Sequence, residues 1–175
     1  MPEITHLFSK VLVPEMTAEL EKTRRVLVRV QDGVPAAQAN FRPHPKSTPL
    51  LALANHLTTV SGLCGTVMTA NSADAGGPTD PRRIVKEAEI AGILRVFDEL
   101  AARSLRSLES AADESFLAPW QLTRQGRVMF EGTRYAALRN LCLNHMIHHR
   151  AQLTSYLRLL EIPVPALYGP TADET

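Results

Sequence analysis

Proline and glycine gather in four short stretches of the chain, and this distribution restricts the fold more than any other feature. The stretches are residues 33–49, 76–81, 119–132 and 163–170, and the segments between them contain few residues of either type. Proline removes a backbone donor and glycine is costly to order, so both tend to end helices. The chain therefore predicts four long helices joined by loops.

Each long segment carries apolar residues at three- and four-residue steps, which is the spacing of one helical face. The predicted helices cover residues 7–30, a segment that starts at Pro49, residues 84–108 and residues 133–160. Because Pro14 would break a helix interior, we expect the regular part of the first helix to begin there. The charged residues of this first segment, among them Glu15 and Glu19, are interpreted as a solvated face. The predicted stripes are Val13, Met16, Leu20, Leu27 and Val30; Leu53, His56, Val60, Leu63 and Val67; Ile90, Leu94, Phe97, Ala101, Leu105 and Leu108; and Leu138, Cys142, His145, His149, Gln152, Leu153, Tyr156 and Leu160.

Length, composition and the four predicted helices favour one all-α domain, a four-helix bundle. The chain has 175 residues, of which 45% are hydrophobic and only 5% aromatic. We expect residues 1–170 to form the domain, residues 171–175 to fray, and residues 120–129 to hold a short hairpin. A net charge of +1 gives no basic footprint for nucleic acid. No apolar run approaches a membrane span, and no signal peptide is apparent, so we expect a cytoplasmic protein.

Three histidines fall on the predicted core faces. His56 lies on the stripe of the second helix, and His145 and His149 lie one turn apart near the middle of the apolar side of the fourth. His148 falls at the edge of that side. Burying an imidazole without a partner costs a few kcal/mol, and a metal ion offsets this cost by binding one nitrogen of each ring. Ordinary hydrogen bonds in the core would also satisfy these rings, and the spacing alone leaves both interpretations open.

Several stretches resemble the DinB-like metal-binding four-helix family. They are Phe41 to Ser47 with Leu53-Ala-Asn-His56-Leu57, then His145-Met-Ile-His-His149-Arg-Ala-Gln-Leu153, and the ending from Ile162 to Pro170. The resemblance covers nearly the whole chain in order. It implies an up-down bundle with a long crossover, a homodimer, and one divalent metal held by His56, His145 and His149. For three imidazole ligands, zinc or nickel is expected.

The resemblance also implies a metal-dependent enzyme that acts on a small molecule. Its better understood relatives are thiol transferases and isomerases that use low-molecular-weight thiols such as bacillithiol or mycothiol. No carboxylate lies between His145 and His149, where HExxH metalloproteases place their base. A metal-activated thiol needs less help from a base than water does, so we favour a thiol-dependent S-transferase over a hydrolase. A loop carboxylate such as Glu131 would favour the hydrolase, and a metal-bearing stress-response protein without turnover is the alternative outside enzymes.

Other polar residues near the predicted centre have open roles. Gln152, one turn after His149, either hydrogen-bonds a ligand or water or only assists helix packing. His148 is either an acid or base at the pocket mouth or simply exposed. Arg150 is interpreted as pointing outward into solvent, and Trp120 either lines the pocket or packs in the core. Both cysteines, Cys64 and Cys142, are interpreted as small buried hydrophobic residues.

Overall fold

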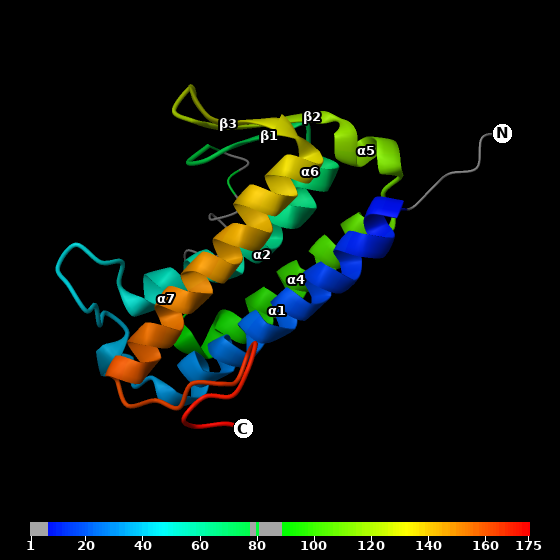
Figure 1. Cartoon of the computed structure of the whole chain (residues 1–175). Helices are drawn as coiled ribbons and strands as arrows, with labels where there is room; N and C mark the ends of the chain where they lie inside the picture. The colour runs from blue at the N-terminus through cyan, green and yellow to red at the C-terminus, as the bar shows by residue number, and fades with distance from the viewer. Residues whose placement is uncertain (1–6, 78–79, 81–88) are drawn as a thin grey trace.

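The computed structural model describes residues 7–77, 80 and 89–175, and these form a mostly helical fold with four main helices (Figure 1). The first three are α1 (Leu7–Gly33), α2 (Leu50–Thr69) and α4 (Ile93–Glu109). The fourth consists of α6 (Arg134–Ala137), η3 (Leu138–Asn144) and α7 (His145–Leu159). Short helical turns lie in the connections, at η1 (Ala36–Gln38), η2 (Ile90–Gly92) and α5 (Asp113–Leu117).

The four main helices enclose one apolar core. α4 packs against α1 and α2, and α7 packs against the same two helices from the other side. The predicted stripes supply the core: Met16, Leu27, Leu53 and Leu153 are each at most 1% exposed. The prediction of a four-helix architecture from apolar periodicity is therefore confirmed.

The first helix begins earlier than predicted. α1 starts at Leu7 and continues through Pro14, which we had expected to mark its start. The side chain of Asp113, from α5, accepts the backbone N–H groups of Leu7 and Phe8 at 2.8 and 2.9 Å. A carboxylate that caps the free N–H groups of the first turn stabilises helix in front of the proline. In the third helix, the expected residues 84–88 lie outside the described residues.

The fourth helix is not regular along its whole length. Thr133 caps its start, since its side-chain oxygen accepts the N–H of Ala136 at 3.1 Å. Residues Leu138–Asn144 then form a π-helix, with wider turns than an α-helix, and regular α-helix resumes at His145. Because the π-helix changes the angle per residue, a single helical wheel does not describe the whole segment.

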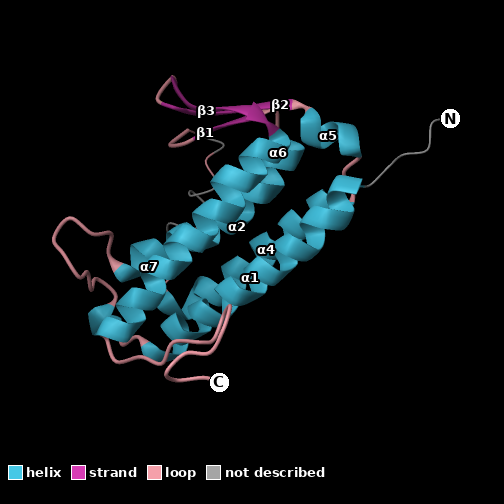
Figure 2. Cartoon of the chain, viewed as in Figure 1, coloured by secondary structure: helices cyan, strands magenta, loops and turns pink. Residues whose placement is uncertain are grey.

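A small sheet lies across one end of the bundle, next to α5 and α6 (Figure 2). β2 (Pro119–Arg124) and β3 (Arg127–Thr133) form an antiparallel hairpin, and β1 (Ser72–Asp74) pairs with β2 in parallel. Gln125 and Gly126 form the two-residue turn, both with positive φ, as such hairpins require. The hairpin expected within residues 120–129 is therefore confirmed, whereas β1 had no prediction.

The expectation that no apolar segment is long enough to span a membrane was wrong. α2 is long and apolar enough to cross a membrane by length and composition, with a mean hydropathy of 1.3. However, 67% of its most apolar stretch is buried inside the bundle. Its apolar character is explained by its central place in the core.

Two charged residues predicted to face solvent are buried instead. Arg150 is 1% exposed and Glu19 is 7% exposed, and their side chains form an ion pair between α7 and α1. Arg150 also donates to the Glu19 carbonyl at 2.8 Å, to Thr23 Oγ1 at 3.0 Å and to the Tyr168 hydroxyl. The outward placement of Arg150 was therefore wrong, because a partner 131 residues away satisfies its charge.

The C-terminal segment returns along α1 and is held there by charged groups. Burial and the hydrogen bond to Glu19 raise the pKa of Tyr168 to about 12. The phenol therefore keeps its proton and donates it to the Glu19 carboxylate. Glu174 pairs with Arg25 and Arg29, and Asp173 pairs with Arg158. The last residues, for which we expected fraying, thus make specific contacts in the structure.

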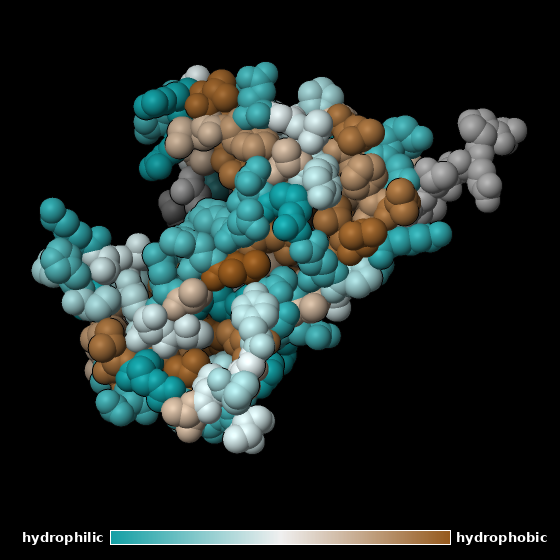
Figure 3. All heavy atoms as spheres, in the orientation of Figure 1, coloured by the Kyte–Doolittle hydropathy of each residue, from teal (hydrophilic) through white to brown (hydrophobic). Residues whose placement is uncertain are grey.

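The described surface mixes polar and apolar residues, and apolar ones gather near the start of α1 and α5 (Figure 3). Leu7, Val11 and Leu117 are each more than half exposed there. Beneath them Phe8 stacks on Phe116 with ring centroids 5.3 Å apart. This surface is continuous with the core and lies at the same end of the bundle as the sheet.

Candidate metal centre

The structure brings His56, His145 and His149 together in the interior of the bundle. His56 comes from α2, and the other two come from the first two turns of α7. The Nε2 atom of His145 lies 3.2 Å from that of His56 and 2.7 Å from that of His149. One ligand atom from each residue lies within 4.8 Å of the other two, and all three side chains are half-buried. The cluster is therefore able to hold a metal ion.

The hydrogen bonds on the far side of two rings indicate which nitrogens face the centre. His145 Nδ1 lies 3.3 Å from the carbonyl oxygen of Leu141, and only a protonated nitrogen bonds to a carbonyl. His149 Nδ1 lies 2.8 Å from Oε1 of Gln152, which accepts in the same way. In the neutral rings both Nε2 atoms therefore carry lone pairs, and these point at each other across 2.7 Å. Two lone pairs at this distance repel unless the two nitrogens share a proton or both bind one metal ion, so the donor set fits a metal ion.

The surroundings also favour the neutral, metal-binding form of these rings. Burial lowers the pKa of His145, and the neighbouring His149 and His148 lower it further, against the opposing effect of the bond to Leu141. Burial likewise lowers the pKa of His149, although its bond to Gln152 acts in the opposite direction. Because metal ions compete with protons for imidazole, lowered pKa values leave the ligands free at neutral pH.

Gln152 and His148 lie at the outer side of the centre. Both are exposed. Gln152 accepts from His149 through Oε1, and its Nε2 donates to Nε2 of His148 at 3.2 Å. Of the two roles left open for Gln152, the structure shows the hydrogen bond to His149. His148 is not part of this cluster, in agreement with its predicted place at the edge of the apolar side of the helix.

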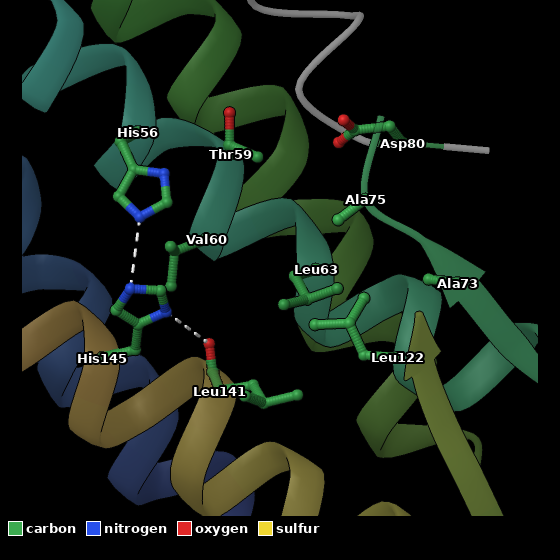
Figure 4. A pocket seen from close by; sticks show the side chains of 10 residues that line it. All are labelled: His56, Thr59, Val60, Leu63, Ala73, Ala75, Asp80, Leu122, Leu141 and His145. Carbon is green, nitrogen blue, oxygen red and sulfur yellow. Dashed lines mark hydrogen bonds between the residues drawn. The ribbon is translucent and has the colours of Figure 1, made fainter. Parts of the chain in front are cut away.

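A cavity of about 160 Å³ lies beside the centre, with His56 and His145 in its wall (Figure 4). Most of its lining is apolar and comes from α2, η3 and the sheet, including Val60, Leu63, Leu122 and Leu141. Its other polar residues are Thr59 and Asp80. Asp80 was missed in the sequence because nothing in its local pattern shows that the loop after β1 folds against α2.

The other residues considered from sequence lie away from this cavity. Trp120 is buried at 2% exposure, with its ring 6.4 Å from that of Phe130, so it packs in the core. Glu131 is exposed on β3. Cys64 and Cys142 are free and buried, and burial, together with the neighbouring Cys64, raises the pKa of the Cys142 thiol. Their interpretation as small buried hydrophobic residues is confirmed.

The family pattern of the DinB superfamily matches residues 19–153, a span that includes all three clustered histidines. The chain belongs to the DinB superfamily. The solved structures of two DinB-like proteins share its fold. The one from Bacillus subtilis is 18% identical with a TM-score of 0.66, and the match covers 90% of this chain and 97% of that one. The one from Bacillus cereus is 20% identical with a TM-score of 0.62, and the match covers 89% and 94%.

A search of curated proteins found no match to this DinB superfamily member. At 18% and 20% identity, the two structural matches establish the fold and not the activity. What this chain does must be argued from its own histidines and cavity.

Proposed function

We propose that this protein is a metal-dependent enzyme in which His56, His145 and His149 hold one divalent cation, zinc or nickel. The observation that carries the proposal is the pair of lone-pair nitrogens of His145 and His149, held 2.7 Å apart with His56 beside them. A divalent cation on three neutral imidazoles keeps its full charge, and it lowers the pKa of a thiol or water at its remaining position.

The chain's own residues hold the three rings in place. The Leu141 carbonyl and the Gln152 side chain each accept from an Nδ1 atom, which keeps both Nε2 atoms facing the centre. Arg150, the residue after His149, forms a buried ion pair with Glu19 that connects α7 to α1. The apolar walls of the cavity suit the apolar part of a substrate.

Among enzyme activities we favour a thiol-dependent S-transferase that uses a low-molecular-weight thiol. Among the described residues, no carboxylate belongs to the cluster that could hold the metal. A thiol whose proton the cation has displaced is already a nucleophile, whereas hydrolysis also requires a base beside the water.

A hydrolase is the second candidate, because one carboxylate does line the cavity. Asp80 lies across the cavity from His56 and His145 in Figure 4, with apolar side chains between them. A general base must reach its proton directly or through one water. Its place opposite the histidines, rather than beside them, therefore ranks hydrolysis below thiol transfer.

The experiment that tests the proposal incubates metal-loaded protein with a panel of small thiols and electrophiles, and with esters and amides as controls. We expect thioether products, detected by mass spectrometry, that disappear with His149→Ala and persist with His148→Ala. Turnover of the esters or amides alone would replace the transferase with the hydrolase. A protein that binds metal and turns over none of these compounds would support a metal-bearing protein without catalysis.

A further inference from the structure

The fourth helix changes its winding immediately before two of the three clustered histidines. The π-helix η3 covers Leu138–Asn144, and regular α-helix resumes at His145. π-Helices, in which the backbone hydrogen bonds span five residues rather than four, are rare and often occur at functional sites. The position of this irregular segment therefore calls for a reason, either in packing or in function.

The end of the π-helix changes the bonding partner of the His145 backbone. In a regular α-helix the N–H of this residue would donate to the carbonyl of Leu141, four residues earlier. It donates to the carbonyl of Cys142 instead. The Leu141 carbonyl accepts from the ring of the same histidine, at 3.3 Å from Nδ1 (Figure 4). The side chain of His145 thus uses the acceptor that a regular helix would give to its backbone.

His149 provides a comparison within the same centre, because it lies in the regular α7. There the carbonyl four residues earlier belongs to His145 and takes part in the backbone bonding of the helix. The ring of His149 bonds through Nδ1 to the side chain of Gln152 at 2.8 Å. The histidine in the regular helix is therefore held by a side chain, and the histidine at the end of the π-helix by a backbone carbonyl.

His145 is the middle ring of the cluster. Its Nε2 lies 3.2 Å from that of His56 and 2.7 Å from that of His149. A proton held on Nδ1 by a carbonyl leaves the Nε2 lone pair free to bind a metal ion and fixes the orientation of the ring. We propose that η3 is a positioning element of the metal centre, whose winding frees the Leu141 carbonyl to orient His145. This inference rests on the metal binding in the function proposed above, and not on the reaction.

Deletion of Asn140 tests this inference in the full-length protein. Asn140 is exposed within η3, and its removal takes out one residue that the wide turns accommodate. The helix should then wind regularly as far as His145, whose N–H should take the Leu141 carbonyl. We expect the zinc affinity, measured by competition with a chromogenic chelator, to fall about 10- to 100-fold.

The stability of the metal-free protein distinguishes positioning from packing. If η3 orients His145, the zinc affinity of the deletion variant should fall while its urea midpoint stays the same or rises. If η3 serves packing alone, the urea midpoint should fall while the folded variant binds zinc as before. Asn140→Ala is the matched control, because it alters the same exposed side chain and keeps the length of the helix; its zinc affinity should stay within about twofold of that of the unaltered protein.

A zinc affinity of the deletion variant within about twofold of that of the unaltered protein would overturn the inference. If circular dichroism shows that this variant does not fold, NMR of the zinc-loaded unaltered protein decides. The Nδ1 proton of His145 should then exchange slowly with water, and fast exchange would refute its bond to Leu141. Zinc binding without turnover would refute only the proposed reaction, whereas an unaltered protein that binds no divalent metal would refute both proposals.

Discussion

Replacing Arg150 by alanine should destabilise the protein far more than an ordinary surface substitution. The guanidinium is buried and bonds to the Glu19 carboxylate, the Glu19 carbonyl, Thr23 and Tyr168. Its removal leaves the Glu19 carboxylate without its fully buried cationic partner, while Lys22 still pairs with it at the partly exposed edge. Breaking a buried pair in this way costs about 3–5 kcal/mol.

Urea denaturation followed by circular dichroism measures this loss. For a slope of about 2 kcal/mol per molar urea, the midpoint should fall by roughly 1.5–2.5 M. The control is Arg24→Ala, which breaks the Arg24–Asp98 pair, where both side chains are nearly half exposed. Exposed pairs contribute only about 0.2–1 kcal/mol.

A double variant separates the stranded charge from lost packing. Glu19→Leu combined with Arg150→Met removes both charges and keeps apolar volume, so it should recover much of the stability lost in Arg150→Ala. If Arg150→Ala and Arg24→Ala shift the urea midpoint equally, the buried pair does not hold α7 against α1 as argued.

Three further predictions address the pH dependence, the centre and the core. Burial raises the pKa of Glu19, but bonds from Lys22, Tyr168 and Arg150 outweigh this effect and lower the pKa below 4.5. The stability that the ionised Glu19 adds should be complete above pH 4.5 and should be lost as the pH falls through the lowered pKa. The urea midpoints of the unaltered protein and of Glu19→Gln should therefore converge at low pH. Gln152→Leu removes the acceptor of His149 Nδ1 and should weaken metal binding about 10- to 100-fold in a chelator competition. An unchanged metal affinity would show that Gln152 does not orient His149. Ser104→Ala removes two hydrogen bonds between α4 and α2: the serine hydroxyl donates to the Ser61 carbonyl at 2.6 Å and accepts the Gly65 N–H at 3.0 Å. Thermal unfolding should show that the free energy of unfolding falls by about 1–3 kcal/mol. An unchanged free energy of unfolding would mean that these bonds contribute nothing to stability.

The sequence predicted the features that depend on local periodicity. Apolar residues at helical spacing fixed the four helices and most of the core, because burial of one face decides where a helix packs. His145 and His149 lie four residues apart within the regular α7, so the helical wheel placed them on one side correctly. The π-helix before them does not disturb this relation, since it ends at Asn144.

Features that depend on partners far along the chain were missed or misplaced. Arg150 and Glu19 each have a polar neighbourhood in sequence, and only their mutual contact across two helices makes burial acceptable. The helix in front of Pro14 depends on a cap from Asp113, about 100 residues later in the chain. Asp80 enters the cavity through the turn after β1, a three-residue strand too short to give a periodic signal.

Metal content of the purified protein tests the central claim most directly. The protein is purified without a nickel column and its metal is measured by elemental analysis, next to the variants His56→Ala, His145→Ala, His149→Ala and His148→Ala. Three converging imidazoles predict about one divalent ion per chain in the unaltered protein and in His148→Ala, and loss of that ion in the other three variants. A metal-free unaltered protein that also fails to take up added zinc or nickel, or a His149→Ala variant that keeps its ion while His148→Ala loses it, would contradict this account.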